Sequence, residues 1–129
     1  MKINNFEDLE VWQEARKLAK FVFQITSKEP FVKDYRFRDQ IRAAAGSIMD
    51  NLAEGFGRDG NKEFSNFLSI AKGSNEEVRS QSYRAFDYEY ISEEVLKELL
   101  ERTDKLSRKI KRFMNYLKNS PYKGTKFRL

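Results

Sequence analysis

Apolar residues recur along this chain with the period of an α-helix, and the strict alternation of a half-buried strand is weak throughout. Pro30 and Pro121 read as boundaries, and helical patterns fill the interval between them. The patterns predict helices over residues 7–26, 34–56 and 62–90, and a fourth from Ser92 to about residue 118. Short connections between four amphipathic helices favour an all-α, antiparallel up-down-up-down four-helix bundle over residues 1–118.

The fourth helix has the clearest signals. Ser92 is placed to cap it, and two acidic residues follow in the first turn. Its apolar positions then follow a heptad-like spacing: Leu96, Leu99, Thr103, Leu106, Ile110, Phe113 and Leu117. Asn5 is the corresponding cap for the first helix.

The first helix has more apolar surface than a single bundle needs. At 100° per residue its apolar side chains cover an arc of about 200°. The face that a bundle helix packs against its own core is only about 100° wide. The surplus predicts a second covered face and therefore a homo-oligomer. The residues assigned to the oligomer interface are Val11, Leu18, Phe21 and Ile25.

Composition removes much of the usual site chemistry. The 129 residues include no cysteine and no histidine, which excludes disulfides, histidine-based triads and the common zinc sites. Cysteine-free chains suit a reducing cytoplasm, and no apolar run approaches the ~18 residues of a membrane span. We expect a cytoplasmic protein without membrane contact, cofactor or catalytic residues.

Net charge is +5, and the positive charge is concentrated at one end of the chain. Nine basic residues and no acidic residue follow Asp104. Such a patch can neutralise phosphates, although cations also complement the dipole at a helix C-terminus. The residues predicted to contact nucleic acid are Lys105, Arg108, Lys109, Lys111, Arg112 and Lys118. We expect residues 119–129 to form a basic, flexible tail.

Carboxylates on one side of the fourth helix offer an alternative. Glu98, Glu101 and Asp104 lie at helical spacing, as magnesium ligands do in all-α pyrophosphatases. A solvated acidic face gives the same pattern. A magnesium-dependent nucleotide hydrolase is accordingly a weaker alternative hypothesis.

Polar residues of the second helix project within about 60° of one another beside its apolar stripe. This ordering predicts a hydrogen-bond network at a helix or subunit interface. The residues of the predicted network are Gln40, Ser47, Asn51, Glu54 and Arg58.

Residues 55–60 match G-x-G-x-x-G, the fingerprint of a dinucleotide-binding turn. That motif requires a preceding strand, and here a helix precedes it. We interpret the segment as a helix-terminating loop in which Gly55 and Gly57 end the helix through the left-handed conformation.

Several strings together resemble the four-helix-bundle family of 23S rRNA intervening-sequence proteins. They are residues 8–13 (DLEVWQ), 40–44 (QIRAA), 47–48 (SI), 51–58 (NLAEGFGR), Phe64, and 67–74 (FLSIAKGS). The resemblance covers about residues 6–118. Met49 follows Ser-Ile where the family often has proline.

The resemblance implies a homopentamer of bundles and a link to ribosomal RNA. The accessory variability proteins of diversity-generating retroelements are similar in fold and imply work with nucleic acid. The leading hypothesis is a non-enzymatic oligomeric protein that binds nucleic acid, RNA above all, or acts as a scaffold. The alternative is a protein–protein assembly module without nucleic-acid binding.

Overall fold

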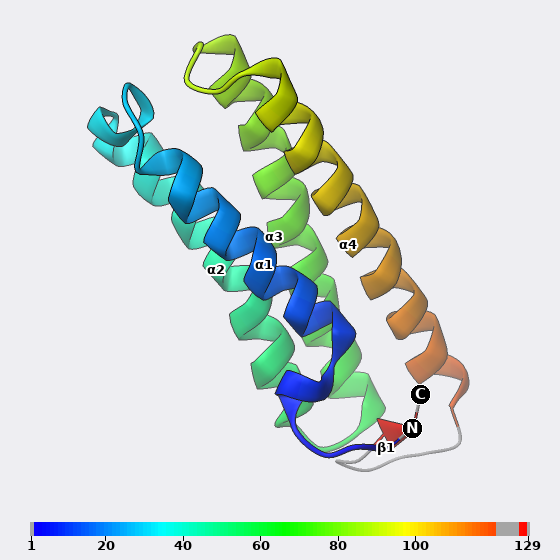
Figure 1. Cartoon of the computed structure of the whole chain (residues 1–129). Helices are drawn as coiled ribbons and strands as arrows, with labels where there is room; N and C mark the ends of the chain where they lie inside the picture. Colours follow the sequence, from blue (N-terminus) through cyan, green and yellow to red (C-terminus); the bar gives the residue numbers. More distant parts are fainter. Residues whose placement is uncertain (1, 121–126, 129) are drawn as a thin grey trace.

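Four long helices lie side by side in the computed structural model, which describes residues 2–120 and 127–128 (Figure 1). Their bounds are α1 Glu10–Thr26, α2 Tyr35–Phe56, α3 Asn61–Asp87 and α4 Glu93–Asn119. Short 3-10 helices, Phe6–Asp8 and Phe31–Lys33, precede α1 and α2. Two-residue strands β1 (Lys2–Ile3) and β2 (Phe127–Arg128) pair antiparallel. The all-α class with four helices is confirmed.

Helix α3 makes the most extensive helix–helix contacts of the bundle, with α2 on one side and α4 on the other. Hydrogen bonds link Gln40 of α2 to Arg84 and Ser47 to Ser74, so α2 and α3 run in opposite directions. Two asparagines of α3 donate hydrogen bonds to α4. Asn61 bonds to the carbonyl oxygen of Leu117, and Asn75 bonds to that of Thr103. Helices α3 and α4 are therefore antiparallel as well.

One hydrophobic core runs through the bundle. Its largest fully buried side chains come from every long helix and from the segments that precede α1 and α2, and each contributes about 1.5–3 kcal/mol by leaving water. They are Ile3, Leu9, Leu18, Phe31, Ile41, Ile48, Leu52, Phe64, Leu68, Leu99 and Leu106. Among the described helices, none combines the length and the apolar character that a membrane span requires.

Two predicted helix ends differ from the structure. Asn5 caps the 3-10 turn at Phe6–Asp8 instead of a long helix, and α1 begins only after Leu9, which is extended and fully buried. At the other end of the bundle, α3 stops at Asp87 because Glu89 adopts a φ of 62°. This turn directs Tyr90 inward, where its ring lies 5.0 Å from the ring of Phe31.

Other boundaries agree closely with the sequence. The Ser92 side chain accepts a hydrogen bond from the Val95 amide at 3.2 Å, as its capping role requires. Asp34 caps α2 by accepting from the Phe37 amide at 3.2 Å, and it also accepts from the Tyr90 hydroxyl at 2.8 Å. The connection after α3 is thereby tied to the start of α2.

The glycine-rich segment joins two helices, in line with the interpretation as a helix-terminating loop, but the reason given for its glycines was wrong. Gly57 has a φ of −74°, and Gly55 lies inside α2. The left-handed region is occupied by Gly60, at φ 90°. Gly55 is needed for space instead, because an added Cβ would lie 2.6 Å from Cβ of Phe67 and 2.9 Å from Cδ1 of Phe64.

Three of the four residues assigned to an oligomer interface are already covered within the single chain. Val11, Leu18 and Ile25 are 4%, 1% and 7% exposed, so their assignment to that interface is corrected. The arc is wide because α1 contacts both α2 and α4. Phe21 remains partly exposed, with the Arg102 guanidinium 5.3 Å from its ring.

The boundary between bundle and tail falls near its predicted position. Helix α4 ends at Asn119, and Ser120 is its C-cap. Of the predicted tail, Phe127–Arg128 pair with β1. The prediction of flexibility for residues 121–126 and 129 lies outside the described residues.

The contact at Gly55 generates a stability prediction. Gly55→Ala should destabilise the protein by about 1–3 kcal/mol, because the methyl group overlaps two phenylalanine side chains at the α2–α3 crossing. Gly73→Ala is the matched control: it is also helical, but nothing lies within 4 Å of its added Cβ. This control should gain roughly 0.5–1 kcal/mol from helix propensity. Urea denaturation measures both, and equal effects would contradict the tight crossing.

Candidate nucleic-acid interface

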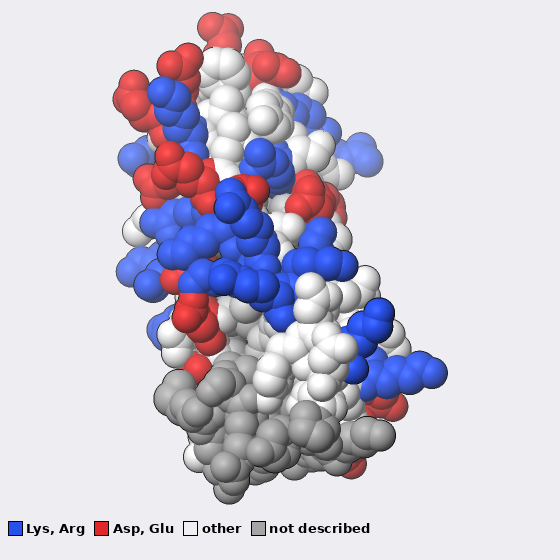
Figure 2. All heavy atoms as spheres, turned by 90° about the vertical axis from the view of Figure 1, so that its right-hand side faces the viewer, with Lys and Arg blue, Asp and Glu red and all other residues white. Residues whose placement is uncertain are grey.

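The amphipathic pattern of α4 determines where its charges lie. One face buries Leu96, Leu99, Thr103, Leu106, Ile110, Phe113 and Leu117, so the polar positions project outward. Acidic residues occupy the first half of these outward positions and basic residues the second half. Figure 2, which views the α4 side, shows Lys and Arg gathered in a band across the middle of this face, with acidic side chains clustered toward its upper end.

A groove of about 670 Å³ lies within this band, between α3 and α4. It is lined by Lys72, Ser107, Arg108, Lys111 and Arg112, and we call it the cationic groove. Three of its four cations belong to the predicted nucleic-acid set. Lys72 comes from α3 and was missed, because the sequence alone does not show which turn of α3 lies beside Arg108.

Three of the predicted cations are engaged in ion pairs. Lys105 lies 3.8 Å from Glu14 of α1, Lys109 pairs with Glu10 of α1, and Arg108 pairs with Asp104 one turn earlier. The side chain of Lys109 is only 19% exposed. Lys109 therefore serves mainly to hold α1 against α4.

The remaining cations are available to a ligand. Among the described residues, no acidic side chain forms an ion pair with Lys72, Lys111, Arg112 or Lys118. Lys111, Arg112 and Lys118 are exposed, and Lys72 is partly exposed. Unpaired cations that converge on a groove are suited to an anionic partner.

Asp104 and Glu101 border a smaller hollow of about 320 Å³ beside the cationic groove, together with Lys105, Arg108 and Arg112. The hydrogen bond from Arg108 lowers the pKa of the Asp104 carboxyl below its ordinary value. The pair with Arg108 therefore favours the ionised form of this carboxyl. Asp104 marks the level along α4 at which the surface changes from basic to acidic.

The hypothesis of a magnesium site requires carboxylates that converge, and they do not. Glu98 bonds to Arg102 at 2.8 Å, and Asp104 is engaged by Arg108. In the described part of the chain, no group of three or more Asp or Glu side chains is placed to share a metal ion. The spacing of Glu98, Glu101 and Asp104 is that of a solvated helix face.

The predicted polar network of α2 is divided into three parts. Gln40 accepts a hydrogen bond from Arg84 of α3 at 3.4 Å. Ser47 bonds to Ser74 of α3 at 3.0 Å and also accepts from Asn51 at 3.0 Å. Glu54 and Arg58 form a separate exposed pair at 3.7 Å. The first two parts lie at the α2–α3 interface, and the third faces solvent.

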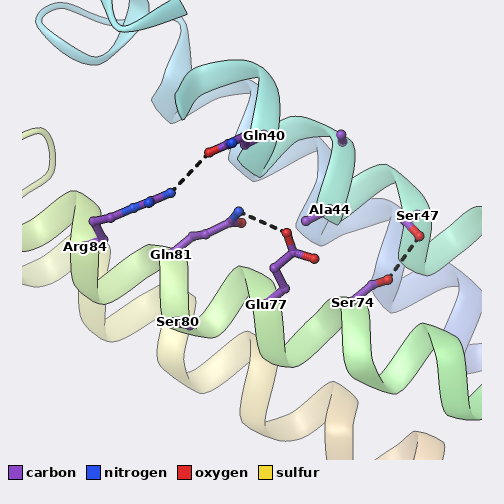
Figure 3. A pocket seen from close by; sticks show the side chains of 9 residues that line it. Gln40, Ala44, Ser47, Ser74, Glu77, Ser80, Gln81 and Arg84 are labelled. Carbon is purple, nitrogen blue, oxygen red and sulfur yellow. Dashed lines mark hydrogen bonds between the residues drawn. The ribbon is translucent and has the colours of Figure 1, made fainter. Parts of the chain in front are cut away.

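Between α2 and α3 lies a second groove, of about 560 Å³, which we call the α2–α3 groove (Figure 3). Its floor contains Gln81, which is 7% exposed. The Gln81 amide nitrogen donates to Glu77 at 3.3 Å, while its Oε1 atom is buried without a hydrogen-bond partner. The lining residues are Gln40, Ala43, Ala44, Ser47, Ser74, Glu77, Ser80, Gln81 and Arg84.

Comparison with known proteins identifies the chain at the level of family and fold. A protein-family profile described as 23S rRNA-intervening sequence protein matches residues 7–112. No curated protein matches the chain.

A similar solved structure is a protein of unknown function from the S23 ribosomal protein family of Bacteroides thetaiotaomicron. It is 19% identical, with a TM-score of 0.74, over 81% of this chain and 97% of the other. At this identity the similarity shows a shared fold. The family profile spans most of the chain, and we conclude that this protein belongs to the family of 23S rRNA-intervening sequence proteins.

Proposed function

We propose that this protein is a cytoplasmic, non-enzymatic nucleic-acid-binding protein that acts on RNA through its cationic groove. The observation that carries the proposal is the convergence of Lys72, Arg108, Lys111 and Arg112 on one groove between α3 and α4. The description of the family as 23S rRNA-intervening sequence proteins supports RNA as the nucleic acid.

The groove is suited to phosphate groups. Arginine can form two parallel hydrogen bonds to phosphate oxygens, and lysine supplies a mobile point charge. The Ser107 hydroxyl adds a neutral donor among the cations. Each cation that neutralises a phosphate releases condensed counterions, so the affinity should depend strongly on salt.

Reversal of two unpaired cations tests the proposal. Lys111→Glu combined with Arg112→Glu should weaken binding to a fluorescently labelled ribosomal RNA fragment by roughly tenfold or more, and should flatten the dependence of log K on log salt by about 1.5. Fluorescence anisotropy over a salt series measures both quantities.

The matched control is Lys28→Glu combined with Arg36→Glu, which makes the same change in charge near the α1–α2 connection. It should leave most of the affinity in place. Absent binding, or binding that does not respond to salt, would contradict the proposed function.

A second candidate function, assembly with further copies of the chain, is supported by the α2–α3 groove. The buried Oε1 atom of Gln81 has no partner among the described residues, which is a costly state for a polar atom. Gly46 has nothing within 4 Å of an added Cβ, so packing within one chain does not require its small size. Close approach by a second copy accounts for both features.

Charge on this surface also fits a contact with a neighbouring copy. Glu77 and Arg84 line the same groove, so an acidic and a basic group are available to a neighbouring copy. Ile70 of α3 is 52% exposed and adds apolar area. We propose that the homo-oligomer, five copies in the form that the family resemblance implies, uses this face as one side of a head-to-tail interface, because a closed ring of five needs two different surfaces of each copy.

A bulky residue in the groove should disrupt the assembly. Ser80→Trp should lower the mass measured by size-exclusion chromatography with light scattering to that of a smaller species, because the indole occupies the groove. Ser69→Trp is the matched control, since Ser69 is also exposed on α3 but does not line the groove. A monomeric wild-type protein, or equal loss of mass in both variants, would refute the assignment.

A further inference from the structure

We infer that the cationic groove is one end of a longer track along the α3–α4 seam that binds the sugar–phosphate backbone of a nucleic-acid double helix. This inference rests on the proposed function and specifies the class of nucleic acid. The inference goes beyond the clustered charge of α4, because α3 supplies one of the two sides of the track.

The second half of the track is another groove, of about 640 Å³, between the start of α3 and the end of α4. Lys62 contributes a cation from α3, and Lys118 contributes one from α4. Lys111 lines this groove and the cationic groove as well, so the two are contiguous. The other lining residues are Gly60, Asn61, Ser65, Asn66, Met114, Asn115, Leu117 and Ser120.

The antiparallel register of α3 and α4 sets the cations in a regular arrangement. Asn61 bonds to the Leu117 carbonyl, which places Lys62 level with Lys118. Asn75 bonds to the Thr103 carbonyl about four turns away, which brings Lys72 level with Arg108. Cations therefore flank the seam on both sides, and Lys111 lies between the two levels.

The length of the track indicates a polymer rather than a mononucleotide. Lys62 and Lys72 are ten residues apart on one helix, as are Arg108 and Lys118 on the other. At a rise of 1.5 Å per residue these separations correspond to about 15 Å. A duplex advances about 3.4 Å per step, so the track spans about four phosphates of one strand.

The lining indicates paired rather than unpaired strands. Proteins that bind single strands provide aromatic rings on which the bases stack. Among the described residues that line the two grooves, none is aromatic. Tyr116 is a nearby aromatic residue, but it is partly buried, packs against Phe113 and lines a separate hollow with Glu10 on the α1 side.

The neutral groups of the track fit a duplex backbone. Ser65, Asn66, Ser107 and Asn115 offer hydroxyls and amides between the cations. Such groups bond to phosphate oxygens and to sugar hydroxyls without reading the bases. Glu101 and Asp104 lie beyond Arg108 and repel phosphate, so they limit the track at that end.

The test compares three ligands with the full-length protein: a short RNA duplex, a DNA duplex of the same sequence and the unpaired RNA strand. We expect at least one duplex to bind about tenfold or more tightly than the single strand, and the tighter duplex identifies the source of the backbone. Tighter or equal binding of the single strand would overturn the inference.

Two charge reversals on α3 locate the track. Lys62→Glu and Lys72→Glu should each weaken duplex binding and lower the salt slope by about 0.9, whereas Lys28→Glu should not. Circular dichroism confirms that each variant is folded. Loss of affinity in Lys72→Glu alone would overturn the extended track while leaving the proposed function intact. If none of the three ligands binds, the proposed function itself fails.

Discussion

The register between α3 and α4 is the constraint on which the candidate interface depends. Asn75 is fully buried, and its amide donates to the Thr103 carbonyl at 2.7 Å. One turn further along α3, Arg79 donates to the Leu100 carbonyl at 2.8 Å. A shift of one helical turn, about 5.4 Å, would leave these groups buried and unpaired. The polar contacts inside the bundle thus determine which lysines of α3 meet which arginines of α4 on its surface.

Helix α3 has different surroundings on its two flanks. Toward α4 its surface residues are basic or neutral and polar, and the seam is suited to a polyanion. Toward α2 the residues that line the groove are small, neutral and polar, or of mixed charge. A single helix can therefore contribute to nucleic-acid binding and to self-assembly without either surface obstructing the other.

Much of the fold could be predicted from sequence because local signals and tertiary packing agree. Ser92 and Asp34 lie at helix starts both in the sequence pattern and in the structure. The buried stripe of α4 follows its heptad spacing. Leu9 shows where the prediction fails: its neighbours favour a helix, yet burial of its side chain in the core holds its backbone extended. Helical periodicity also cannot distinguish a face covered by the same chain from one covered by another copy. For that reason Val11, Leu18 and Ile25 were assigned to the wrong surface.

The candidate interface was predictable only on α4, where the cations are adjacent in sequence. Lys62 and Lys72 are separated from them by more than thirty residues, and only the antiparallel register brings them together. The ion pairs of the basic residues could not be predicted either, because their partners lie on a different helix. Glu10 pairs with Lys109, and Glu14 pairs with Lys105.

The division of charge along α4 has a consequence for motion as well as for contact. Residues 93–104 contain five acids and two bases, whereas residues 105–119 contain six bases and no acid. Over a helix about 40 Å long, this separation makes one half of the exposed α4 face attract a polyanion and the other half repel it. A polyanion that approaches this face will therefore be oriented toward residues 105–119 before it makes contact. Ordinary cellular salt, with a screening length of about 8 Å, confines this orientation to the last moments of approach.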